Sequence, residues 1–86
     1  MFHYDYKTAG TCSQLISFDI DGDVVRNISF MGGCNGNLKG ISKLCDGMSV
    51  DDIESKLAGT LCGMRGTSCP DQLSKAVREA YNKSLA

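Results

Sequence analysis

The sequence predicts an α+β domain in which a three-stranded antiparallel sheet is followed by three helices packed on one face of that sheet. Two observations give this order. The first part of the chain alternates apolar and polar residues, which is the period of a half-buried strand. The second part repeats apolar residues at helical spacing. With 86 residues the chain is expected to form a single domain over residues 1–86.

The strand region is expected to contain one short strand and then a hairpin. The short strand is predicted from the alternation in residues 2–6. The hairpin is predicted from a run between Cys12 and Asp21, a turn signal at Asp21-Gly22, and a second run that starts at Val24. The residues expected on the core face of the sheet are Phe2, Tyr4, Tyr6, Ile16, Phe18, Ile20, Val24, Ile28 and Phe30.

Three helices are predicted in the remainder of the chain. The first follows the stretch 32–37, which is rich in glycine and asparagine. The second begins at a capping signal formed by Ser49 and Asp52, and Gly59 is placed to end it. The third starts around Pro70, whose fixed φ suits a first helical turn. The residues expected on the buried helix faces are Leu38, Ile41, Leu44, Cys45, Val50, Ile53, Leu57, Leu73, Ala76, Val77, Ala80 and Tyr81.

Charge and hydropathy narrow the class of protein. Nine basic and ten acidic residues give a formal net charge of -1, without the dense basic surface that nucleic-acid binding needs. No apolar run approaches the ~20 residues of a membrane span, and residues 1–5 do not resemble an export signal. We therefore expect a cytoplasmic protein that binds no nucleic acid directly and does not enter a membrane.

Common catalytic patterns do not occur in this sequence. His3 lies on the polar side of the first predicted strand and is expected to be an ordinary surface histidine. Asp21, Asp23, Asp51 and Asp52 are expected to serve turns and helix caps. The chain has no nucleophile–histidine arrangement and no GxxxxGK[ST] loop, so hydrolase and nucleoside-triphosphatase interpretations lack support.

Five cysteines in a short cytoplasmic chain indicate metal ligation or thiol chemistry rather than a disulfide framework. Cys12, Cys34 and Cys69 fall at predicted element ends, and Cys62 lies in the loop before Cys69. Four thiolates that met at one point would satisfy a tetrahedral zinc site. Cys45 lies on an apolar helical stripe and is expected to be a small buried hydrophobe. Spacing alone leaves a metal site and a set of buried structural thiols both open, because no Cys-x-x-Cys pair occurs.

Two motifs carry a family resemblance. Residues 67–71 read TSCPD, and residues 33–37 read GCNGN. With these motifs the chain resembles a short, freestanding member of the TSCPD domain family, from Gly10 through the final helix. That domain is also found at the C-terminal part of adenosylcobalamin-dependent ribonucleotide reductases. The resemblance implies a role in ribonucleotide reduction, and hence in deoxynucleotide supply for DNA synthesis.

The size of the chain limits what this resemblance implies. A ribonucleoside-diphosphate reductase catalytic subunit needs a large barrel, radical-site cysteines, a nucleotide pocket and a radical source, which 86 residues cannot hold. We therefore expect an accessory module that associates with a reductase catalytic subunit and holds zinc. The predicted zinc ligands are Cys12, Cys34, Cys62 and Cys69. An enzymatic alternative is a thiol relay that passes reducing equivalents to the reductase.

A more distant similarity concerns the NifU/IscU-type scaffold proteins of iron–sulfur assembly. Cys12, Cys34 and Cys69 match in order that family's cysteines, which lie before a hairpin, after it at a helix start, and at the head of a later helix. Residues 39–58 and 70–85 resemble the helical half of the scaffold. The similarity implies the same βββααα fold and an iron–sulfur cluster as the alternative to zinc.

The chain departs from the scaffold pattern at two positions. Gln14 replaces an aspartate that helps make the cluster transferable, and Ser68 replaces a histidine. Cys62 would add a fourth thiolate and close the site. A closed site favours stable binding over delivery of a cluster.

Overall fold

The computed structural model describes residues 2–8, 13–32, 35–59 and 69–85, and its elements follow the predicted order of three strands and three helices. The chain therefore has the predicted α+β fold. The elements are β1 (Phe2–Lys7), β2 (Ser13–Asp21), β3 (Val24–Gly32), α1 (Asn35–Cys45), α2 (Val50–Leu57) and α3 (Cys69–Ser84).

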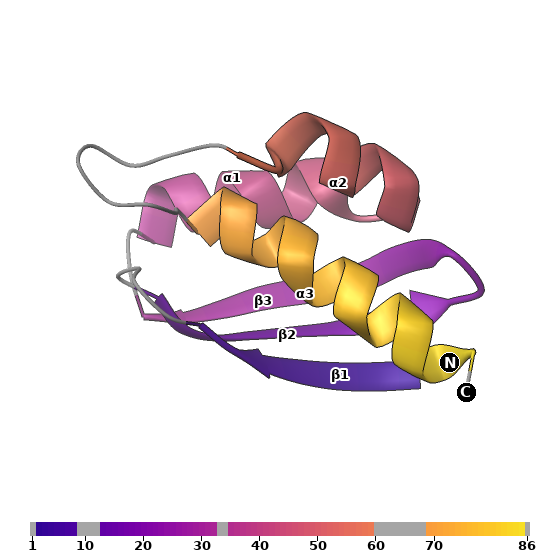
Figure 1. The fold of residues 1–86 in the computed structure, drawn as a ribbon. Helices are drawn as coiled ribbons and strands as arrows, with labels where there is room; N and C mark the ends of the chain where they lie inside the picture. The colour runs from indigo at the N-terminus through magenta and orange to yellow at the C-terminus, as the bar shows by residue number, and fades with distance from the viewer. Residues whose placement is uncertain (1, 9–12, 33–34, 60–68, 86) are drawn as a thin grey trace.

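The three strands form one antiparallel sheet in the order β1-β2-β3, so β1 and β3 are its two edges. Gly22, with a φ of 66°, lies in the tight turn that joins β2 to β3. Glycine suits this position because it has no Cβ to clash at positive φ. All three helices cover the same face of the sheet (Figure 1), as the sequence predicts.

The register of the hairpin shifts at Asn27, and this shift decides which valine enters the core. Asn27 has a φ of 57°, and the pairing of β2 with β3 is irregular between Ser17 and Asp19, opposite it. An extra residue in a strand breaks the alternation, so side chains before and after it that are an even number of positions apart point to opposite faces. Val25 is therefore fully buried, and Val24 is only partly buried. The prediction that Val24 faces the core was wrong because strict alternation does not survive this bulge.

The core lies between the sheet and the helices, and Phe2 and Leu44, like Val24, are predicted core residues that lie outside it, with Phe2 36% exposed. Leu44 is 77% exposed, whereas its neighbour Cys45 is 4% exposed. Leu38 and Cys45 are both buried because seven residues make about two helical turns, which returns Cys45 to the face of Leu38. The side chains with at most 2% exposure are Ile16, Phe18, Ile20, Val25, Val50, Ile53, Leu73, Ala76, Val77, Ala80 and Ser74.

The ends of α2 follow the sequence signals. Ser49 Oγ accepts a hydrogen bond from the Asp52 amide at 3.1 Å, which confirms the predicted N-cap. The helix ends at Leu57, and Gly59 adopts a φ of 81° two residues later. This positive φ is the conformation that glycine provides after a helix.

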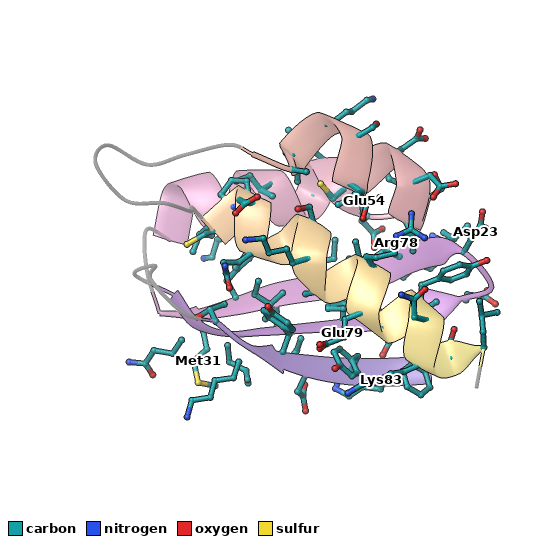
Figure 2. The ribbon with its side chains drawn as sticks, in the orientation of Figure 1. Asp23, Met31, Glu54, Arg78, Glu79 and Lys83 are labelled. Atoms are coloured by element: carbon teal, nitrogen blue, oxygen red, sulfur yellow. The ribbon has the colours of Figure 1, made fainter. Side chains whose placement is uncertain are left out.

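Charged side chains on α3 tie that helix to its neighbours. Arg78 donates to both carboxylate oxygens of Glu54 on α2, at 3.1 Å each, and Figure 2 shows the two residues beside each other. Tyr4 on β1 donates to Glu79, and Lys83 Nζ lies 5.2 Å from the centre of the Tyr4 ring. No helix in the described ranges is long and apolar enough to cross a membrane.

Candidate functional site

Of the four cysteines predicted to bind zinc, one is among the residues that the structure describes. Cys12, Cys34 and Cys62 lie outside the described residues. Cys69 is the first residue of α3, and it is 7% exposed. Within the described ranges, no group of three or more His, Cys, Asp or Glu side chains is arranged so that it could hold a metal ion.

Several element ends meet at the end of the molecule where α3 begins. Ser13, at the start of β2, pairs with Gly32, at the end of β3. The Gly59 amide, just after α2, donates to Asp71 Oδ1 in the first turn of α3 at 2.8 Å. Figure 1 shows the starts of α1 and α3 on the same side of the molecule as these strand ends. The fold thus gathers strand ends and helix starts into one region.

The first turns of α3 bury polar side chains beside Cys69. Asp71, Gln72 and Ser74 are 4%, 6% and 1% exposed. Asp71 Oδ2 lies 3.2 Å from Lys75 Nζ, and Ser74 Oγ donates to the Asp71 carbonyl oxygen at 2.6 Å. Among the described side chains, no buried nitrogen or oxygen lacks a hydrogen-bond partner. We call Cys69, Asp71, Gln72 and Ser74 the α3 head.

The α3 head has the chemistry to stabilise negative charge. The amide groups of the first helical turn point out of the helix, and the helix dipole adds a partial positive charge there. Asp71 already uses this position, and Cys69 is buried next to it, which by itself disfavours a charged thiolate. A thiolate at Cys69 would be stabilised by the same helix end.

Cys45 differs from Cys69 in its place on its helix. It is the last residue of α1, where the helix dipole disfavours negative charge, and it belongs to the hydrophobic core. Burial raises the pKa of the Cys45 thiol above its ordinary value, and nearby Lys56 offsets part of this rise. Cys45 therefore stays a protonated thiol at neutral pH, and its prediction as a small buried hydrophobe is confirmed.

A polar network on the open face of the sheet was not predicted from the sequence. His3 Nδ1 lies 2.7 Å from Asp19 Oδ1, and His3 Nε2 lies 2.9 Å from Asp5 Oδ1. Ser17 Oγ donates to Asp5 at 2.7 Å, and Asn27 Nδ2 donates to Asp19 at 2.9 Å. We call these five residues the open-face network. Strand alternation places His3 and Asp5 on one face, but only the register of β1 on β2 brings Asp19 to them.

Hydrogen bonds set the charge states in the open-face network. The bonds to Asp19 and then Asp5 raise the pKa of His3 above its ordinary value. The pKa of Asp5 is lowered chiefly by the bond from Ser17, and the pKa of Asp19 chiefly by the bond from Asn27. The network thus favours a charged histidine between two carboxylates. The His3 side chain is 60% exposed, so its prediction as a surface histidine is confirmed.

The fold and the α3 head together define a small α+β domain with a cysteine at the start of its last helix. The family model of the TSCPD domain matches residues 3–81, which is nearly the whole chain. The chain therefore belongs to the TSCPD domain family. No curated protein and no solved structure matches it, and the similarity to NifU/IscU scaffold proteins stays a prediction.

Proposed function

We propose that this chain is a zinc-binding accessory domain of ribonucleotide reduction, with Cys12, Cys34, Cys62 and Cys69 as the zinc ligands. The reductase part rests on the TSCPD family, whose domain also occurs at the C-terminal part of adenosylcobalamin-dependent ribonucleotide reductases. The zinc part rests on one structural observation. The described element ends next to the four cysteines lie at one end of the molecule.

Two of these cysteines neighbour the paired ends of the sheet in sequence. Cys12 immediately precedes Ser13, and Cys34 follows Gly32 by two positions. Ser13 and Gly32 are paired across β2 and β3. Consecutive Cα atoms are about 3.8 Å apart, so a short chain length separates each cysteine from this pair.

The other two cysteines belong to the junction of α2 and α3. Cys69 is in the α3 head, and Cys62 follows Gly59 by three positions. Gly59 is held to the α3 head by its hydrogen bond to Asp71. This junction and the sheet ends share one end of the molecule (Figure 1), which supports a single centre over four separate thiols.

Zinc at this centre would act as a structural cross-link. It would join the sheet, through Cys12 and Cys34, to the helical layer, through Cys62 and Cys69. Four-thiolate zinc sites are tetrahedral and closed, and they contribute directly to folding. The binding free energy would stabilise a small domain and shape the surface offered to a reductase.

Metal analysis tests the zinc part of the proposal. Protein purified without chelator is expected to contain about one zinc per chain. Cys34→Ala and Cys69→Ala are expected to lose most of the zinc, and the matched control Cys45→Ala is expected to keep it. Iron in place of zinc would favour the iron–sulfur alternative. A folded protein with little metal and reactive thiols would contradict both.

A binding titration tests the reductase part. The zinc-loaded chain is expected to bind the catalytic subunit of an adenosylcobalamin-dependent ribonucleotide reductase, and Cys69→Ala is expected to bind more weakly. A thiol relay would instead require a cysteine pair that cycles between dithiol and disulfide. Reductase turnover that persists with a Cys62→Ser/Cys69→Ser variant would contradict the relay. Absence of binding by the zinc-loaded chain would contradict the accessory role.

A further inference from the structure

The outer edge of β3 is covered only near its start. The Val25 amide donates to the Met48 carbonyl at 2.9 Å, and the Val25 carbonyl accepts from the Gly47 amide at 2.7 Å. The turn of residues 46–49 thus occupies the position of a neighbouring strand. Along residues 28–32, no described residue outside the sheet forms a hydrogen bond with the backbone of β3. An edge of this kind presents backbone donors and acceptors to another chain.

A groove lies beside this uncovered part of the edge, between β3 and α1. It has a volume of about 320 Å³, and its apolar surface includes Ile28 and Leu38. Lys39 and Lys43 on α1 line the same groove. An adjoining hollow, which shares Ile28 and Lys43, extends toward Asp46 in the 46–49 turn. Figure 1 shows α1 running along the helical side of β3.

Within the part of the chain that the structure describes, the two lysines in the groove form no ion pair. Lys75 and Arg78 on α3 pair with carboxylates within 4 Å, whereas no carboxylate of the described residues pairs with Lys39 or Lys43. Lys39 lies in the middle of α1 and Lys43 in its last turn, and both lysines are exposed. The groove therefore combines a backbone edge, an apolar floor and a positively charged rim.

We propose that the β3–α1 groove binds an extended, acidic segment of a partner protein, which adds to the sheet as a fourth strand beside β3. An extended backbone provides donors and acceptors at the spacing of a neighbouring strand, about 4.7–4.9 Å. The 46–49 turn shows that this edge accepts such pairing. The phosphates of a nucleic acid could pair with the lysines, but they could not form strand-like hydrogen bonds with the backbone of β3.

The side chains of the bound segment follow from strand alternation. The side chains of the segment that point to the helical side lie over Ile28 and beneath the lysines. A glutamate fits there, because its methylene groups can contact the apolar floor and its carboxylate can pair with Lys39 or Lys43. Those on the other side lie along Ser29 and Met31, which is 59% exposed on the face away from the helices (Figure 2). A β-branched residue suits that side. This inference is independent of the zinc centre.

A synthetic peptide tests the proposed strand addition. The probe is the pentapeptide Thr-Glu-Val-Glu-Thr with blocked ends, and its control is Thr-Lys-Val-Lys-Thr. In a nuclear magnetic resonance titration, the glutamate peptide is expected to shift the signals of residues 28–32 and of α1. It is also expected to slow amide exchange along β3, which a contact through side chains alone would not do.

Charge reversal tests the role of the lysines. The Lys39→Glu/Lys43→Glu variant is expected to bind the glutamate peptide about tenfold more weakly and to gain affinity for the lysine peptide. Lys7→Glu, on the opposite edge of the sheet, is the control and is expected to leave both affinities unchanged. The gain for the lysine peptide distinguishes charge recognition from loss of folding.

Several outcomes would overturn the proposal. The proposal is wrong if both peptides bind with equal affinity, or if neither binds at millimolar concentration. It is also wrong if the signal shifts are centred on β1 or the α3 head. A peptide N-methylated at alternate amides that binds as tightly as the unmodified one would also overturn it, because that change removes backbone donors. If the amides of β3 exchange more slowly at higher protein concentration without peptide, the edge pairs with a second copy of the chain instead.

Discussion

His3 links the stability of the fold to pH through a few exposed side chains. Its pKa is raised above 6.5, its ordinary value, by Asp19 and Asp5, so the folded state binds the histidine proton more tightly than the unfolded state. That stabilisation is complete below pH 6.5 and is lost as pH rises through the raised pKa. The pKa values of both carboxyls are lowered below 3.8, so their stabilisation is lost as pH falls through the lowered values.

The open-face network is therefore expected to stabilise the fold most between these limits. In His3→Gln, the loss of melting temperature relative to the unchanged protein is expected to be largest near about pH 5.5 and to shrink toward pH 8. Thermal unfolding monitored by circular dichroism across this pH range measures the difference. His3 is the one histidine of the chain, so no other imidazole contributes to the change. A constant difference from pH 5 to 8 would contradict this account.

At the scale of elements, α2 and α3 are joined at two places. One junction is the hydrogen bond from Gly59 to Asp71, which spans 12 residues of sequence. The other is Arg78, which pairs with Glu54 at 3.1 Å and with Asp51 at 2.5 Å. In the first junction Asp71 is buried, although Gly59 is exposed, whereas in the second Asp51 is exposed and Glu54 is partly buried. Surface ion pairs contribute little, so the buried junction is expected to matter more.

A comparison of variants at two aspartates separates the contribution of the Gly59–Asp71 junction to stability from the contribution of a negative charge at a helix start. Asp71 and Asp52 are each the third residue of their helix, and Asp52 is exposed. Asp71→Ala is expected to lower the free energy of unfolding by about 1–3 kcal/mol, because the Gly59 amide loses its acceptor. Asp52→Ala is expected to cost only about 0.5 kcal/mol through the lost dipole interaction. Urea denaturation of both variants tests the difference, and equal losses would show that the junction contributes nothing.

Local signals predicted the elements well and failed where two elements meet. The Ser49 cap and the end of α2 depend on neighbouring residues, so the sequence contains all the information they need. Val24 and Leu44 were assigned to the core from periodicity alone. Val24 is not in the core because of the bulge at Asn27, and Leu44 is not in the core because it lies on the side of α1 that faces away from the sheet. Neither factor is visible in a short window of sequence.

At the scale of the whole molecule, one sheet and one helical layer share a single core. The proposed centre would connect the two layers at the end where α3 begins, opposite the turn between β2 and β3 (Figure 1). A domain of this size buries limited apolar surface, so a metal cross-link has a large effect on its stability. Stability is therefore expected to depend on zinc.

Thermal unfolding with and without zinc tests this dependence. Binding to the folded state alone stabilises it by about 2.7 kcal/mol when free zinc is 100 times the dissociation constant. A chelator is expected to lower the melting temperature of the unchanged protein and of Cys45→Ala, and to leave Cys69→Ala unaffected. Because zinc displaces thiol protons, the stabilisation is also expected to weaken at acidic pH. An unchanged melting temperature on addition of chelator or zinc would contradict the prediction.

The sequence by itself determined the order of the elements, the buried character of Cys45 and the TSCPD motif, because periodicity, caps and motifs are local properties. Only the tertiary structure decided that Asp71 holds Gly59, that Asp19 reaches His3, and that β3 and α1 enclose a groove with two lysines. Each of these contacts joins residues that are distant in the chain. Their formation depends on strand register and on the packing of helices over the sheet, and neither is encoded by any single segment.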